Sequence, residues 1–212
     1  MDEDTKALAA LAGPAPPPPL REPWEFTRAF SLFRQGKIDA AETVFRALLG
    51  SELLRAPVNF FLGNCLYARG RYLEALPYYD AAIALGDRPD NKALNAYFYN
   101  QGLALFELGR FAPAAEALRR SIARYSKDPL PWLFLGRCEA ELGRFPEAIE
   151  ALESSIRIQP DLRLAYYQLA RLHAEHGDKA RAGELFQKVA GIRKQELDKE
   201  EQTARRLKLS GK

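Results

Sequence analysis

One pentapeptide, ELGRF, occurs twice in the chain, at residues 107–111 and again at residues 141–145. Related segments are RQGKIDAA from Arg34, ARGRYLEA from Ala68 and EHGDKARA from Glu175. Their aligned glycines are Gly36, Gly70, Gly109, Gly143 and Gly177; three of the four intervals between them are equal, and the interval from Gly70 to Gly109 is five longer. A nearly fixed period of about 34 residues indicates a stack of similar units rather than one irregular core.

Small and large residues recur at fixed places around each glycine. Seven residues before it stand Ala29, Gly63, Gly102, Gly136 and Ala170, and five residues after it stand Ala41, Ala75, Ala114, Ala148 and Ala182. Nine residues after it stand Phe45, Tyr79, Leu118, Leu152 and Phe186. The small residues predict close contact between two helix backbones, and the large ones are expected to fill the space beside that contact.

Each copy is predicted to be a helix, a turn and a second helix. The glycine can end the first helix in a left-handed conformation that other residues adopt at a cost. In the third copy the expected core-facing residues are Phe98, Gly102, Leu105 and Leu108 on the first helix, and Ala117, Leu118, Ile122 and Tyr125 on the second. Pro129, Pro131 and Pro160 are expected between helices, and GDRPDNKA at residues 86–93 is expected to be a lengthened polar turn.

The composition of the 212 residues is typical of a soluble globular protein, with 47% hydrophobic and 28% charged residues. The net charge of +3 is too small to favour a nucleic-acid binder or a membrane-surface protein. No apolar run is long enough for a membrane helix, and the acidic start does not resemble a secretory signal, so a cytoplasmic location is expected. Cys65 and Cys138 lie on separate copies and are expected to be buried rather than paired.

The repeated pattern resembles the tetratricopeptide repeat (TPR) family. The resemblance covers Pro23 to about Ala190 and is strongest in LFLGRCEAELGRFPEAIEALESSIRIQP of the fourth copy. It implies an all-α fold, a right-handed α-solenoid of about five helix-turn-helix repeats with a C-terminal capping helix. Residues 22–192 would form the repeat array and residues 193–212 a charged C-terminal helix or tail.

Residues 1–21 are expected to form a disordered tail rich in alanine and proline. The segment AGPAPPPPLREP contains four successive prolines, which favour an extended polyproline II spacer. A docking site for a small polyproline-binding domain is the alternative to a flexible tether.

Family resemblance also implies a concave groove, lined by the first helix of each pair, that holds a partner peptide. The residues predicted to line this groove are Phe30, Phe60, Phe61, Asn64, Tyr67, Tyr99, Asn100, Leu103, Phe106, Phe134, Arg137, Tyr167, Gln168 and Arg171, and Leu133 is expected beside Phe134. An exposed aromatic surface of this kind is typical of a binding site. An apolar segment would lie against the aromatic rings, while Asn64, Asn100 and Gln168 bind its backbone and Arg137 and Arg171 attract an acidic group.

The sequence leaves two alternatives open for these residues. Several of the aromatic side chains could pack between adjacent helices, and the chain's own ends could occupy the groove. The expected function is that of a non-catalytic scaffold or adaptor that binds a protein or peptide partner. The alternative is an assembly module that self-associates or builds a larger complex through its groove and edges.

A subset of the family holds the C-terminal carboxylate of heat-shock chaperones with lysine, asparagine and arginine side chains. Asn64 and Arg137 stand at compatible places in this chain. The lysines are replaced by Phe60 and Leu133, and Leu103 stands where a second asparagine is expected. Binding of chaperone tails is therefore not predicted.

Catalysis, metal binding and cofactor binding are not expected. His173 and His176 are three residues apart and lack a third ligand, whereas the usual zinc helix places its histidines four apart. No phosphate-binding glycine loop or nucleophile motif is present. The basic residues Arg119, Arg120 and Arg124 are offset by acidic residues on comparable helices, so neither nucleic-acid binding nor membrane insertion is predicted.

Overall fold

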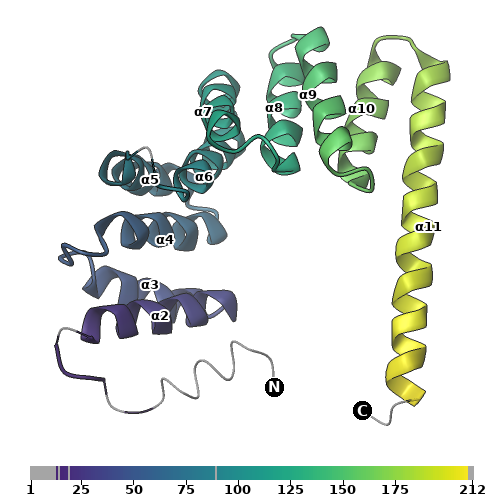
Figure 1. The fold of residues 1–212 in the computed structure, drawn as a ribbon. Coiled ribbons are helices and arrows are strands. Elements are labelled where there is room, and N and C mark those ends of the chain that lie inside the picture. Colours follow the sequence, from purple (N-terminus) through teal and green to yellow (C-terminus); the bar gives the residue numbers. More distant parts are fainter. Residues whose placement is uncertain (1–12, 14, 19, 89, 210–212) are drawn as a thin grey trace. The chain divides into compact units, whose positions relative to one another are not determined.

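The computed structural model describes residues 13, 15–18, 20–88 and 90–209. In these residues the chain forms ten helices and no strand (Figure 1). The helices are α2 (Arg21–Arg34), α3 (Ile38–Ala47), α4 (Arg55–Ala68), α5 (Tyr72–Gly86), α6 (Leu94–Glu107), α7 (Phe111–Arg124), α8 (Pro129–Glu141), α9 (Phe145–Ile158), α10 (Arg163–Glu175) and α11 (Lys179–Leu209). The five predicted helix pairs are therefore confirmed.

The helices belong to two compact units. The N-terminal unit ends at Arg124 and contains α2 to α7, and the C-terminal unit begins at Tyr125 and contains α8 to α11. Within each unit every helix packs on the next one in the chain. The first helices of neighbouring pairs also touch, since α4 contacts α2 and α6 in one unit and α8 contacts α10 in the other. One side of each unit is thus formed by first helices alone.

The five aligned glycines end the first helix of each pair, as predicted. Gly36, Gly70, Gly109, Gly143 and Gly177 have φ angles of 73°, 72°, 70°, 72° and 82°. At each of these turns the next residue donates its amide to a carbonyl in the last turn of that helix, as Arg110 does to Leu105 O at 2.9 Å. A side chain with a Cβ would be strained in this left-handed conformation.

The small residues lie where two helices of a pair approach most closely. A Cβ added to Gly63 would lie 2.6 Å from Cε1 of Tyr79, and one added to Gly136 would lie 2.7 Å from Cγ of Leu152. Tyr79 and Leu152 are almost fully buried. The predicted pairing of a small residue with a large one is confirmed at these places, because the large side chain fills the space that the missing Cβ leaves.

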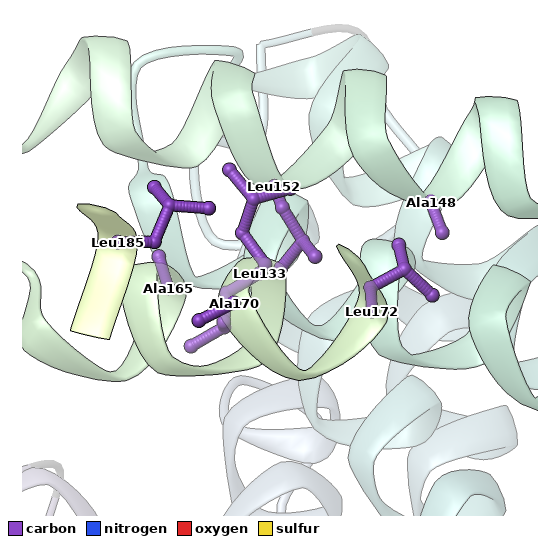
Figure 2. Packing of buried hydrophobic residues seen from close by; sticks show 8 residues of the cluster. Leu133, Ala148, Leu152, Ala165, Ala170, Leu172 and Leu185 are labelled. Carbon is purple, nitrogen blue, oxygen red and sulfur yellow. The ribbon is translucent and has the colours of Figure 1, made fainter. Parts of the chain in front are cut away.

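The core of the C-terminal unit is built from side chains of all four of its helices. Figure 2 shows Leu133 of α8, Leu152 of α9, Leu172 of α10 and Leu185 of α11 in one buried cluster. In the N-terminal unit a buried cluster beneath α2, α3 and α4 includes Phe45, Val58 and Leu62. Partly buried aromatic side chains pack against it, among them Phe61, whose ring stacks on that of Phe45 with centroids 5.4 Å apart.

Expectations about four single residues are wrong. Pro129 and Pro131 lie in the first turn of α8 rather than between helices. The amides of a first turn have no acceptor within the helix, so proline loses no hydrogen bond there. Tyr125 follows the end of α7 and is 51% exposed, so it is not a core residue. Phe186 is 38% exposed, unlike the other four large residues of its set, because α11 is the last helix of its unit.

The inserted residues form a polar connection between α5 and α6, as expected. The side chain of Asn91 donates to Gly86 O at 2.8 Å and accepts from the amide of Ala93 at 3.0 Å. Arg124 of α7 also binds Asp87 of this connection at 3.2 Å. These bonds replace the tight junction that the other pairs have.

The C-terminal residues continue α11 without a break through Leu209. Ala182, Leu185 and Ile192 are buried, and the ion pair between Arg163 of α10 and Glu196 lies farther along the helix. The predicted boundary at residue 193 falls inside this helix, and the division into tail, array and C-terminal segment stays a prediction. Most of the predicted tail lies outside the described residues. None of the described helices contains a stretch long and apolar enough to cross a membrane.

Candidate functional site

A pocket of about 230 Å³ lies between α8 and α10, the first helices of the fourth and fifth pairs. Three of the predicted groove residues, Arg137, Gln168 and Arg171, line it together. The other residues that line it are Gly136, Ala140, Glu141, Leu152, Leu172 and Glu175. The structure thus brings together the predicted polar residues of the C-terminal unit.

The sequence places these side chains on facing sides of two helices. Arg137 and Glu141 are four residues apart on α8, and Arg171 and Glu175 are four apart on α10, so each pair lies along one helix face. Gly136 and Ala140 leave room between the helices because they have little or no side chain. The buried Leu152 and Leu172 close the pocket from below.

The charges of the α8–α10 pocket alternate in sign. Arg171 pairs with Glu175 at 3.0 Å, and the Arg137 guanidinium lies over the Phe134 ring at 4.9 Å from its centroid. Both sides of the Arg171 pair are about half exposed, so the pair adds little to stability and can exchange for another partner. The pocket therefore offers cationic and anionic groups to one ligand.

The acidic members of this pocket were not predicted from the sequence. Glu141 and Glu175 are separated by one repeat period, as are Arg137 and Arg171, so the same charge pattern occurs in both copies. This shared spacing of the arginines and glutamates is the sequence signal that could have predicted the acidic residues.

The predicted aromatic residues of the N-terminal unit are placed differently from one another. Phe61 is partly buried beside the core of its unit, where its ring also meets the rings of Phe26, Phe30 and Phe33 at 5.7, 5.2 and 5.9 Å. Phe60 packs between pairs, with its ring 4.6 Å from that of Tyr97. The alternative of packing between helices thus describes the contacts of Phe61 and Phe60.

The other aromatic residues of the first helices are, like Phe60 and Phe61, mostly half buried. Tyr67 contacts the Tyr72 ring at 5.1 Å, and Phe106 contacts the Phe111 ring at 5.4 Å, each across its own turn. Tyr99 and Leu103 on α6 are also half buried, as are Phe30 and Phe134. Tyr167 is 42% exposed and meets the Phe186 ring of α11 at 6.0 Å. Leu133, expected in the groove, is instead fully buried in the core.

The two predicted asparagines already have partners within the chain. Asn64 accepts a hydrogen bond from the Tyr79 hydroxyl at 2.9 Å, and burial raises the pKa of that hydroxyl. Asn100 donates to Ala96 O, four residues earlier in α6, at 2.8 Å. Asn64 keeps its amide donor and Asn100 its amide oxygen for an additional partner.

The two histidines contact different groups. His173 Nδ1 lies 3.3 Å from the Asp178 carboxylate, and His176 Nδ1 lies 2.7 Å from Leu172 O. The described residues contain no group of three histidine, cysteine or acidic side chains that could hold a metal ion. The side chains of Cys65 and Cys138 are both buried, as expected.

Sequence profiles of the tetratricopeptide repeat match residues 26–91, 99–163 and 164–191, which together make up about three quarters of the chain. The chain belongs to the tetratricopeptide repeat family. This confirms the family that the sequence resembles and places the protein among TPR scaffolds, a class built for protein interaction. A search of curated proteins found no sequence match.

Solved structures of TPR proteins have the same fold. A MamA fragment from Desulfovibrio magneticus RS-1 is 19% identical, with a TM-score of 0.73 over 82% of this chain and 96% of the other. YrrB, described as a TPR protein with an unusual peptide-binding site, is 20% identical, with a TM-score of 0.67 over 90% of this chain and 92% of the other. The Cut9–Hcn1 assembly of the APC/C is 15% identical, with a TM-score of 0.72 over 90% of this chain and 37% of the other. The all-α solenoid fold is therefore confirmed.

Proposed function

We propose that this TPR protein is a non-catalytic adaptor that binds a partner peptide on the side formed by its first helices, with the α8–α10 pocket as the main polar contact. The observation that carries the proposal is the convergence of Arg137, Gln168 and Arg171 in one pocket. An acidic side chain of the partner would pair with the two guanidinium groups, which can each bind a carboxylate with two donors. Glu141 and Glu175 would meet a cationic or amide group beside it.

The first helices of the N-terminal unit offer a separate apolar surface for a partner. Tyr99, Leu103 and Phe106 lie along α6 at intervals of four and three residues, so they form one helix face. Aromatic and arginine side chains are the types that contribute most at protein interfaces. The likeness of fold to YrrB, whose description names a peptide-binding site, agrees with this class of function.

Selection from a random peptide display library against the immobilised protein tests the proposal. We expect the selected peptides to be enriched in Asp or Glu, and we expect Arg137→Ala with Arg171→Ala to lower their affinity by about tenfold or more, since each charged hydrogen bond contributes about 1.5–3 kcal/mol. The matched control is Arg205→Ala with Arg206→Ala, which removes the same charge from exposed places near the end of α11. Equal binding to both double variants would show that the peptides bind elsewhere.

A further inference from the structure

The charged residues that line the α8–α10 pocket are arranged in two levels. Arg137 precedes Glu141 by four residues on α8, and Arg171 precedes Glu175 by four residues on α10. The connections from α8 to α9 and from α9 to α10 are short, so neighbouring helices are antiparallel and α8 and α10 run in the same direction. The two arginines therefore lie at one level of the pocket, and the two glutamates lie at a second level about 6 Å farther along the helices.

This combination of charges is confined to the last two copies of the repeat. Six residues before the turn glycine, the first three copies have Phe30, Asn64 and Leu103 instead of an arginine. A glutamate two residues before the glycine also occurs in the third copy, at Glu107, but without the arginine. The two charge levels are thus a feature of this pocket and not of the repeat in general.

A ligand of one charge sign would be repelled by half of the pocket. Glu175 already pairs with Arg171 at 3.0 Å, whereas Glu141 is exposed and forms no ion pair with another described residue. A purely acidic ligand would bring its carboxylate close to Glu141 without compensating that charge, and like charges placed together at an interface cost affinity. The lining therefore matches a ligand that has an acidic and a basic group about one helical turn apart.

The size and the lining of the pocket favour a helical ligand. A volume of about 230 Å³ is smaller than that of pockets that enclose a whole ligand, so the pocket admits side chains while the backbone of the partner stays outside. Among the described lining residues only Gln168 has an uncharged polar side chain, which is too little to pair the backbone of an extended peptide. The backbone groups of a helix are already paired, and its residues four apart lie on one face at the same spacing of about 6 Å.

We infer that the partner is a helix that presents one acidic and one basic side chain four residues apart to this pocket, an inference that rests on the proposed binding at the α8–α10 pocket. The acidic side chain binds Arg137 and Arg171, and the basic side chain binds Glu141 and Glu175. The two levels select against purely acidic segments and fix where along α8 and α10 the partner helix lies.

Selection from a display library of alanine-based helical peptides tests the inference. One library randomises two positions four residues apart, and a control library randomises two positions two residues apart, which do not share a helix face. We expect the first library to yield pairs of one acidic and one basic residue and the control library to yield none. Replacing the basic residue of a selected peptide by glutamine should lower its affinity about tenfold, the effect expected for one hydrogen bond between charged groups.

The Glu141→Gln, Glu175→Gln variant separates the paired ligand from a purely acidic one. It should bind the selected peptide about tenfold more weakly than the native protein does. It should bind the glutamine-substituted peptide at least as tightly, because Arg171 is released from Glu175. The matched control, Glu150→Gln with Glu153→Gln, removes the same charge from exposed places on α9 and should change neither affinity. Circular dichroism checks that both variants are folded.

Tighter binding of both peptides by the Glu141→Gln, Glu175→Gln variant would overturn the inference, because the ligand would then be purely acidic. A helical library that yields no binder, while the random library does, would overturn it as well. In both cases a loss of affinity in the Arg137→Ala, Arg171→Ala variant would leave the proposed function standing. Equal affinity of that variant and the native protein would contradict the proposed function and the inference together.

Discussion

Two buried serines each form a hydrogen bond between the two helices of one pair, Ser121 in the third pair and Ser155 in the fourth. Ser121 Oγ donates to Asn95 O, and Ser155 Oγ donates to Pro129 O, each at 2.8 Å. The two serines are separated by one repeat period, and both are fully buried. Each bond joins the second helix of a pair to the first turn of its partner helix, so the same junction recurs in both units.

Replacement of Ser155 by alanine should lower the free energy of unfolding by about 1 kcal/mol, the usual net value of one hydrogen bond within a protein. Urea unfolding followed by circular dichroism measures the change. Ser126→Ala is the control, because Ser126 is exposed and only its backbone oxygen accepts a hydrogen bond, from Trp132. A loss of the same size in both variants would mean that the Ser155 bond contributes nothing.

The thiol of Cys65 should resist chemical modification in the folded protein. Burial raises its pKa to about 12, so almost no thiolate exists at pH 8. We expect iodoacetamide to label Cys65 only as fast as the protein unfolds. The raised pKa also contributes stability that is present below about pH 9 and is lost as the pH rises towards 12. Mass spectrometry after timed labelling checks the first expectation; fast labelling of the folded chain would contradict it.

Residue spacing predicted some side-chain positions and missed others. The glycine and alanine places were predictable because only a small residue fits where two backbones approach, a requirement that shows directly in the sequence. Leu133 was misplaced because it is adjacent to Phe134 on the helix, and one residue turns a helix face by about 100°. Whether a residue faces the core or the first-helix side depends on the exact rotation of α8, which spacing alone does not fix.

Close packing within helix pairs can be tested against helix propensity. Gly136→Ala should destabilise the protein by about 1–3 kcal/mol, because the added Cβ would lie 2.7 Å from Leu152 Cγ and 3.0 Å from Ala148 O. Gly183→Ala on α11 should stabilise it by about 0.5–1 kcal/mol, because nothing lies within 4 Å of its added Cβ and alanine favours the helix. Thermal unfolding of both variants measures the difference. Stabilisation of both variants would show that propensity, not packing, decides at Gly136 as well.

Helix starts and stops were predictable to different degrees. The five turn glycines predicted where first helices end, since a left-handed residue stops a helix. The length of α11 was harder to predict, because Gly183 and Gly191 lie inside it without positive φ angles and no stop signal separates residue 192 from residue 193. The second helix of the fifth pair and the charged C-terminal segment are therefore one element.

The whole chain should be monomeric if it acts as the proposed adaptor. We expect light scattering to give the mass of one chain, 23.9 kDa, at micromolar concentrations without a partner. The polar α8–α10 pocket does not complement itself through a large apolar area of the kind that stable dimers bury. A mass that rises with concentration would favour the assembly module instead.

Much of the candidate site was predictable because it follows the repeat. Arg137, Gln168 and Arg171 were found by counting back from the turn glycines, and they line one pocket. Partners such as the Tyr79 hydroxyl on Asn64 were not predictable, because they depend on contacts between residues 15 places apart that meet only in the folded pair.

The last helix, α11, is continuous and longer than its packing in the unit requires. Its 31 residues span about 46 Å, and among those whose burial is described Ile192 is the last buried one, so the following part projects beyond the core of its own unit (Figure 1). A protein fused in continuous helix after Leu209 would be carried about 1.5 Å farther and turned by about 100° for each residue inserted. The number of residues inserted after Leu209 therefore sets both the distance and the orientation of the attached protein.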